Sequence, residues 1–185
     1  LPKTQKYLPK QRLWYIRANE VLISSGSIER PLVFGNNDTP GVMLSSAAKE
    51  YMKVYGVLVG KKPLIFTNND SGYETAIEFK KNGVNPIILD TRSDPSSDII
   101  AEAKNLNIEI KFSHVVVAAK GYKKVKSADI AKISDDKKEL FNIENIECDC
   151  ICVSGFWTPS IHLASQSGNK SKFNEKIDAF VPDKS

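Results

Sequence analysis

The residues best placed to bind a ligand lie in a short polar loop, Thr67-Asn68-Asn69-Asp70-Ser71-Gly72, between an apolar run and an amphipathic segment. In a dinucleotide-binding fold this place holds Gly-x-Gly-x-x-Gly, whose glycines form the turn, admit the pyrophosphate and pack the helix on the strand. Thr67 and Asn69 replace the first two glycines here, and only Gly72 remains. The Asn69 side chain takes the space of an approaching phosphate, and Asp70 would repel one at the helix start. We interpret the loop as a degenerate nucleotide site.

Asp90 is the next candidate, because it ends a second apolar run 23 residues after Thr67 (90 − 67 = 23). An acidic residue near this position binds the ribose hydroxyls of NAD in dinucleotide-binding folds. Arg92 beside it leaves the choice between NAD and NADP open. A strand-end aspartate that merely begins a turn is the equal alternative. The spacing indicates the topology, and we expect the pocket itself to be empty rather than occupied.

A third candidate is a pair of apolar runs that end in Ser-Gly, Val21–Gly26 and Cys150–Gly155, followed by Pro31 and Pro159. An apolar run that stops at glycine is typical of a buried strand with a sharp exit, where backbone can approach a ligand closely. After the second exit, Thr158 is predicted to cap a helix whose first residue is Pro159. Such a helix start would suit a phosphate or a ribose. A capped helix without a ligand is the alternative.

The remaining reactive residue types do not indicate catalysis. His114 and His162 lack the neighbouring nucleophile or carboxylate that a catalytic base needs, so we predict no catalytic residue. Cys148, Cys150 and Cys152 alternate as on a strand, where their sulfurs lie about 6.5–7 Å apart. One tetrahedral zinc ion cannot bind such a row. The sequence therefore predicts a buried strand and no metal site.

Composition excludes several further classes. The 185 residues are 41% hydrophobic and 26% charged with a net charge of +4, which is ordinary for one globular core with flanking arms. The lysine cluster from Lys120 to Lys126 is interpreted as a solvated strand edge rather than a nucleic-acid contact. There is neither an apolar run of 18 residues nor the apolar core of a signal peptide. We expect no membrane contact and a cytoplasmic protein.

The elements that position these residues alternate between strand and helix. Strands are predicted at 64–67, 86–90 and 108–112, with helices from Asp70 to Asn82 and from Ser96 or Ser97 between them. This βαβαβ order predicts a Rossmann-like parallel sheet of the α/β class. Before it we expect a hairpin of 12–17 with 21–23, and a helix capped by Ser45 or Ser46 and closed by Gly56. After it we expect a small antiparallel β-meander around 115–133 and a closing strand at 148–153.

Four stretches of the chain resemble one family, the alpha subunit of heterotetrameric sarcosine oxidase. They run from Arg12 to Ala18, from Ser25 to Leu44, from Phe66 to Tyr73 and from Val153 to Leu163. The resemblance implies a fragment of a subunit with two dinucleotide domains. Residues 1–30 would end the flanking domain, 31–148 would form the inserted Rossmann-like domain, and 149–185 would return to the flanking domain.

The resemblance also implies an activity. The family demethylates sarcosine oxidatively to glycine, passes the one-carbon unit to tetrahydrofolate and gives hydrogen peroxide from oxygen. It implies NAD in the complete subunit, with the intact glycine fingerprint upstream, and FAD and FMN elsewhere in the complex. Tetrahydrofolate would bind a missing C-terminal region, and other subunits would be the partners. The fragment alone is expected to be inactive.

By this resemblance the residues nearest the cofactor act through backbone donation and close approach, and they are Ser25, Gly26, Ser154, Gly155 and Thr158. Thr67, Asn69, Gly72 and Asp90 would form the degenerate site of the inserted domain. Two alternatives stay open. One is a structural module at a subunit interface that binds nothing, and the other is the same region of a related amino-acid or opine oxidase subunit.

Overall fold

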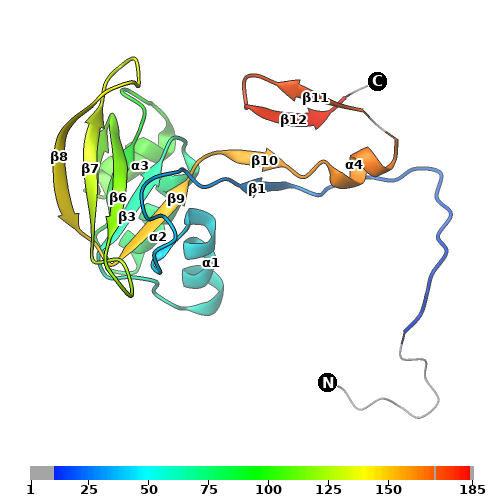
Figure 1. Ribbon diagram of the computed structural model, residues 1–185. Coiled ribbons are helices and arrows are strands. Elements are labelled where there is room, and N and C mark those ends of the chain that lie inside the picture. The colour runs from blue at the N-terminus through cyan, green and yellow to red at the C-terminus, as the bar shows by residue number, and fades with distance from the viewer. Residues whose placement is uncertain (1–10, 169, 184–185) are drawn as a thin grey trace, which may run out of the picture.

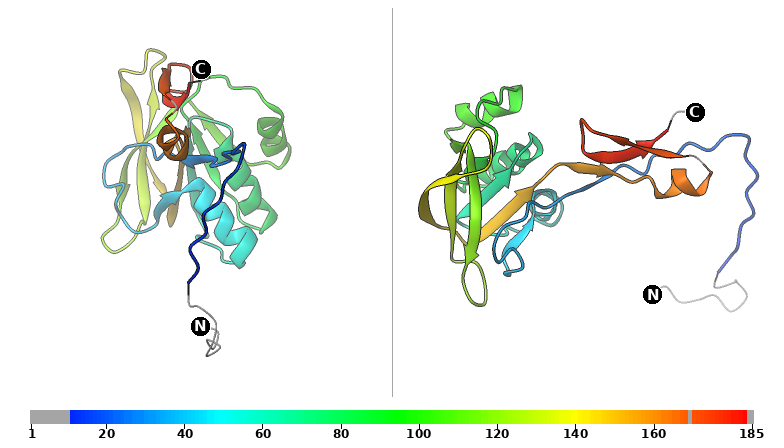
Figure 2. Two further views of the ribbon diagram at one scale, coloured as in Figure 1. Left: turned by 90° about the vertical axis from the view of Figure 1, so that its right-hand side faces the viewer. Right: turned by 45° about the horizontal axis from the view of Figure 1, so that its top comes forward.

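The computed structural model describes residues 11–168 and 170–183. Its body is a parallel sheet flanked by two layers (Figures 1 and 2). The five strands lie in the order β2 (Val42–Leu44), β9 (Cys150–Ser154), β3 (Pro63–Thr67), β4 (Ile87–Asp90) and β5 (Glu109–Phe112). One face carries the helices α1 (Ser45–Tyr55), α2 (Ser71–Lys81) and α3 (Asp98–Asn105). The other carries an antiparallel sheet of β6 (His114–Lys120), β7 (Ser127–Ile133) and β8 (Leu140–Glu147). None of the helices in the described part is long and apolar enough to cross a membrane.

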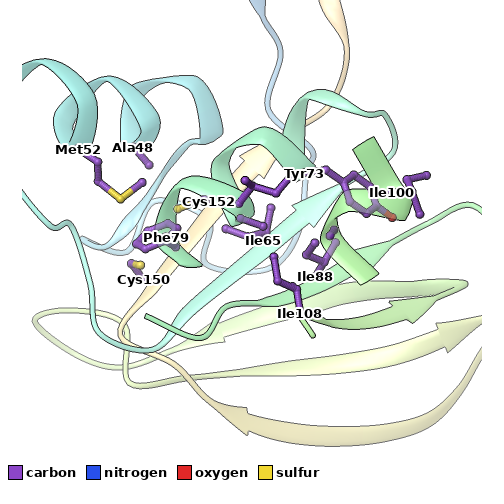
Figure 3. Close-up of a cluster of buried hydrophobic side chains, with 13 residues drawn as sticks. Ala48, Met52, Ile65, Tyr73, Phe79, Ile88, Ile100, Ile108, Cys150 and Cys152 are labelled. Carbon is purple, nitrogen blue, oxygen red and sulfur yellow. The ribbon is translucent and has the colours of Figure 1, made fainter. Parts of the chain in front are cut away.

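The central strands are apolar on both faces because both faces are covered. Ile65 of β3 and Ile88 of β4 face the helices and pack with Tyr73, Phe79 and Cys152 (Figure 3). The alternate residues of the same strands pack against the antiparallel layer in a second buried cluster, which includes Leu64, Phe66, Leu89, Phe34 and Val116. The predicted α/β fold with a parallel sheet and a small meander is therefore confirmed.

The helices begin and end close to the predicted residues, although the start of α1 differs. Gly56 closes α1 in the left-handed conformation (φ 63°), as expected. Neither Ser45 nor Ser46 caps the helix, however, since the N-cap residue is Leu44 and it makes no side-chain cap bond. The Ser46 N–H instead donates to Glu29 Oε2 at 2.8 Å. The cap thus comes from a carboxylate 17 residues earlier, which no local pattern indicates.

A two-stranded ribbon projects from the body (Figure 1). In it β1 (Ser27–Glu29) pairs antiparallel with β10 (Trp157–Pro159), and beyond it lie α4 (His162–Gln166) and the hairpin of β11 (Ser171–Asn174) with β12 (Ala179–Pro182). Thr158 is paired with Ile28, so the prediction that Thr158 caps a helix beginning at Pro159 is wrong. The helix begins three residues later because 157–159 are held extended by the pairing.

The segment before the ribbon also differs from its prediction. Residues 11–26 form no strand, so the hairpin of 12–17 with 21–23 is wrong. Val21 and Leu22 are 78% and 94% exposed, and the run before Gly26 is therefore not a buried strand. Apolar residues that favour strands form one only when they pair with a neighbouring strand. In the described part of the chain, this run pairs with no strand. Residues 1–10 of the predicted first segment lie outside the described residues.

Candidate functional site

Three parallel strands end at the same edge of the sheet, and the candidate residues gather there. Thr67, the last residue of β3, is in register with Asp90 of β4 on one side and with Ser154 of β9 on the other. In open α/β sheets, ligands bind in the crevice at the carboxyl ends of the strands. The structure therefore brings Thr67, Asp90 and Ser154 to the place where a dinucleotide would bind.

The side chain of Asn69 occupies the start of α2. Its Nδ2 donates to the Ser154 carbonyl at 3.1 Å and to Asn68 Oδ1 at 3.0 Å. Its Oδ1 accepts the Ser71 N–H, the first amide of α2, at 2.8 Å. A phosphate bound at a helix N-terminus would use that same kind of amide. Asn69 thus makes, from within the protein, a contact that a pyrophosphate would otherwise make.

Gly72 retains one role of the glycine fingerprint. A Cβ atom at this position would lie 2.7 Å from Thr67 Cβ and 2.8 Å from Thr67 Oγ1. Real Cβ atoms do not approach other atoms so closely, so only glycine lets α2 lie this near to β3. The packing role predicted for Gly72 matches this contact. Thr67 hydrogen-bonds the loop itself, donating from Oγ1 to the Asn69 carbonyl at 2.8 Å.

Asp90 is fully buried and its carboxylate already has partners. The Tyr73 hydroxyl donates to Asp90 Oδ2 at 2.7 Å, and the Arg92 guanidinium donates from Nη2 to the same oxygen at 2.8 Å. Arg92 Nη2 also lies 2.8 Å from Asp70 Oδ1, so one guanidinium bridges two carboxylates. Burial acts to lower the pKa of Arg92, but its bonds to Asp90 and Asp70 outweigh burial and raise it. Burial, and then the bond to Asp90, raise the pKa of Tyr73.

Taken together, these contacts do not fit a bound dinucleotide. Asn69 Oδ1 already holds the Ser71 amide at the start of α2, and Asp70 places a carboxylate at the same helix end. Asp90 is turned to Tyr73 and Arg92 rather than to an open ribose position. Sequence reasoning found the departures at Asn69 and Asp70, but it missed Tyr73, whose aromatic ring belonged to the predicted apolar face of the helix.

The residues predicted at the two Ser-Gly exits do not form one cluster. Ser25 Oγ donates to the Ser160 carbonyl at 2.6 Å, at the far end of the β1–β10 ribbon. Ser154 and Gly155 lie at its base, where the Gly155 N–H donates to the Arg30 carbonyl at 2.7 Å. Gly26 accepts a bond from the Ser160 N–H at 2.9 Å, and Thr158 lies between the two ends.

Close packing explains the glycine at 155. A Cβ there would lie 2.9 Å from the Arg30 carbonyl oxygen and 3.0 Å from the Leu32 side chain. The N–H of Gly155 is already engaged with that same carbonyl, so it is not free to donate to a cofactor. The close approach at this exit is therefore made by residues 30–32 of the protein itself, which follow β1.

The cysteines are buried, as the strand interpretation predicts. Cys150 and Cys152 lie on β9, and Cys148 lies just before it. Burial raises the pKa of the Cys148 thiol to about 12, and a hydrogen bond to Cys150 together with burial raises that of Cys152. In the described part of the chain, no group of three or more His, Cys, Asp or Glu side chains is placed to hold a metal ion.

Comparisons with known proteins bear on this geometry. No family model matches the chain. It is 35% identical over 176 residues to the sarcosine oxidase subunit alpha of Corynebacterium sp. (strain P-1), which covers 94% of the chain and 18% of that protein. The subunit of the same name from Rhizobium meliloti (strain 1021) is 36% identical, covering 95% and 17%. The chain thus spans less than a fifth of the length of these relatives.

Solved structures share the fold. The thioredoxin reductase of T. acidophilum matches with a TM-score of 0.63 at 18% identity, over 80% of this chain and 47% of that one. The L-proline dehydrogenase of P. horikoshii matches with a TM-score of 0.53 at 21% identity, over 86% and 25%. At such identities the likeness concerns the fold alone.

Proposed function

This chain is related over nearly its whole length to a segment of the sarcosine oxidase alpha subunit, and we propose that it serves as a scaffold in the NAD-binding half of such a subunit. The assembly is then a hetero-oligomeric oxidoreductase. It demethylates sarcosine to glycine, transfers the one-carbon unit to tetrahydrofolate and reduces oxygen to hydrogen peroxide. The isolated chain contributes no catalytic residue and is inactive by itself.

One observation carries the proposal, the identity of 33–36% that extends over at least 94% of the chain in three relatives of the same name. The dinucleotide-type fold supports it at a coarser level, because the structural neighbours include thioredoxin reductase and L-proline dehydrogenase. The substrate in this proposal is the one that the names of the three relatives give.

In this proposal the edge formed by β3, β4 and β9 holds no dinucleotide. NAD is held elsewhere in the complete subunit, and FAD and FMN in other parts of the complex. The Asn69 bond to the Ser71 amide and the engagement of Asp90 with Arg92 support this assignment. Ser154 and Gly155 then act by packing the exit of β9 on residues 30–32, and Ser25, Gly26 and Thr158 act by forming the ribbon.

Calorimetric titration of NAD and then NADP into this chain tests the cofactor assignment. We expect no saturable heat at micromolar concentration, because Asn69 and Asp70 oppose a pyrophosphate at the start of α2. Saturable binding that Asp90→Asn abolishes, and that the control Asp129→Asn in the antiparallel layer leaves intact, would overturn it. The NAD site would then lie in this pocket.

The reaction is tested on the assembly. The chain is tagged in its source organism, and the complex is isolated from the cytoplasmic fraction. We expect sarcosine-dependent hydrogen peroxide and, with tetrahydrofolate present, capture of the one-carbon unit. An assembly that oxidises another amino acid or an opine, but not sarcosine, would assign the chain to a related oxidase. An assembly without oxidase activity would leave a structural role only.

A further inference from the structure

A pocket of about 400 Å³ lies where the ribbon joins the body, between the starts of two eleven-residue helices. Its wall includes Glu29 of β1, Ser46 and Lys49 of α1, Ser71 and Glu74 of α2, and Trp157 of β10. These residues come from segments up to 128 positions apart in the sequence (157 − 29 = 128). The pocket adjoins the Asn69 loop through Ser71, but none of the predicted site residues lines it.

Glu29 lines this pocket with a carboxylate of which only one oxygen has a hydrogen-bond partner in the described part of the chain. It is only 4% exposed, although a carboxylate at the end of a short surface strand would ordinarily be solvated. One oxygen, Oε2, accepts the Ser46 N–H at 2.8 Å. The other, Oε1, is buried and has no hydrogen-bond partner among the residues that the structure describes. A buried carboxylate oxygen without a donor is unfavourable, so a group that donates to it would stabilise this pocket.

Lys49, the lysine in the pocket wall, does not supply that donor. Lys49 is paired with Glu74 across the pocket, which leaves the negative charge of Glu29 without a counter-ion there. Ser71 Oγ accepts the Trp157 Nε1–H at 2.7 Å, and this bond fixes the indole as part of the wall. With two carboxylates against one lysine, the side chains that line the pocket carry a net negative charge, which disfavours phosphate and carboxylate ligands. It suits a cation that carries N–H donors and an apolar part.

We propose that this pocket binds a small organic ammonium ion, which donates an N–H to Glu29 Oε1 and packs against Trp157. An ammonium beside a buried carboxylate forms a charge-assisted hydrogen bond, and an indole attracts cations through its π face. A pocket of about 400 Å³ lies within the usual size range of small-molecule sites. The site stands apart from the cofactor assignment above, and neither depends on the other.

The experiment uses the fluorescence of Trp157 as the reporter. The chain has two tryptophans, and Trp14→Phe removes the other, which lies in an exposed segment. Methylammonium chloride is titrated at constant ionic strength, maintained with sodium chloride. We expect a saturable change that Glu29→Gln weakens about tenfold or more, since the charge-assisted bond is lost. The matched control Glu50→Gln removes a charge on the exposed side of α1 and keeps the affinity within about twofold.

Three results would overturn the proposal. One is a response that Glu29→Gln leaves unchanged, and another is an equal response to calcium chloride, which would indicate a metal site. The third is an equal response to tetramethylammonium, which has no N–H to donate.

Because Glu29 also caps α1, Glu29→Gln is checked by circular dichroism. If it does not fold, the comparison of methylammonium with tetramethylammonium on the Trp14→Phe chain decides, with the Ser46 amide signal in an NMR titration as a second reporter.

Discussion

Arg92 connects two loops at the edge of the sheet through a single guanidinium. It contacts Asp90, which is fully buried, and Asp70, which precedes α2. The Tyr73 hydroxyl completes the set by donating to Asp90. A buried carboxylate and the cation paired with it contribute little net stability together. Removing the cation lowers the free energy of unfolding, because an unpaired charge then stays buried. The position that would bind a ribose in a dinucleotide fold is used here to fasten α2 to the end of β4.

We therefore predict that Arg92→Leu lowers the free energy of unfolding by about 3–5 kcal/mol, because Asp90 stays buried without its counter-ion. Arg92→Lys keeps the charge but loses the fork that reaches both carboxylates, so its loss is smaller. Urea denaturation followed by circular dichroism measures both. The control is Arg17→Leu, an exposed arginine outside the body. A loss below about 1 kcal/mol for Arg92→Leu would show that the guanidinium does not hold this edge.

At the scale of elements, sequence and structure agree where the signal is local. The series β3, α2, β4, α3 and β5 was predictable because each member has its own local apolar pattern, and Gly83 marks the end of α2. The strands β1, β2 and β10 have three residues each, and only pairing with distant segments defines them. The apolar run before Gly26 has the composition of a strand but no partner, and composition cannot supply one.

The same limit applies to the candidate site. The loss of the glycines at Thr67 and Asn69 was visible in the sequence, and so was the packing role of Gly72. That Asn69 bonds Ser154, 85 residues away, was not visible, because it depends on the parallel pairing of β3 with β9. The partnership of Tyr73 with Asp90 was hidden for a similar reason, since it joins a helix face to the end of a strand.

The cysteines on β9 and just before it yield a prediction on reactivity and pH. Cys148, Cys150 and Cys152 are each at most 2% exposed, so we expect no thiol to react with Ellman's reagent in the native state and three to react in denaturant. Burial raises the pKa of Cys148 to about 12, so the folded state keeps a proton that the unfolded chain loses above about pH 9. The stability from this thiol is complete below that pH and falls as the pH rises toward 12.

Urea titrations between pH 8 and pH 11 measure this effect. Cys148→Ala should make the decline in unfolding free energy shallower than in the parent chain. Tyr122→Phe is the control, because Tyr122 is 92% exposed and changing it should leave the slope as it was. Fast native-state labelling of any of the three thiols would contradict the burial on which the prediction rests.

At the scale of the whole molecule, two connecting segments of the chain join the ribbon to the body (Figure 2). They are tied to each other, since the Arg30 N–H donates to the Phe156 carbonyl at 2.9 Å and the Gly155 N–H donates to the Arg30 carbonyl at 2.7 Å. Arg30 also donates from Nη1 to the Asp178 carbonyl at 3.0 Å, which fastens the β11–β12 hairpin to the ribbon. The ribbon is therefore fastened at its base by these backbone hydrogen bonds.

The segment leading into the ribbon exposes large apolar side chains along its length. Leu13, Trp14, Tyr15 and Ile16 are 72–91% exposed, and contiguous apolar surface of this kind marks a site of protein contact. We predict that the chain by itself self-associates, with a mass measured by light scattering that rises with concentration in the micromolar range, around 100 µM.

Trp14→Ser combined with Ile16→Ser should reduce that rise, because both side chains lie outside the core and their loss leaves the body intact. The control Tyr122→Ser removes an equally exposed but isolated aromatic ring and should change nothing. A constant monomer mass for the parent chain at every concentration would show that this segment does not mediate self-association. The exposure of its apolar residues would then need another explanation.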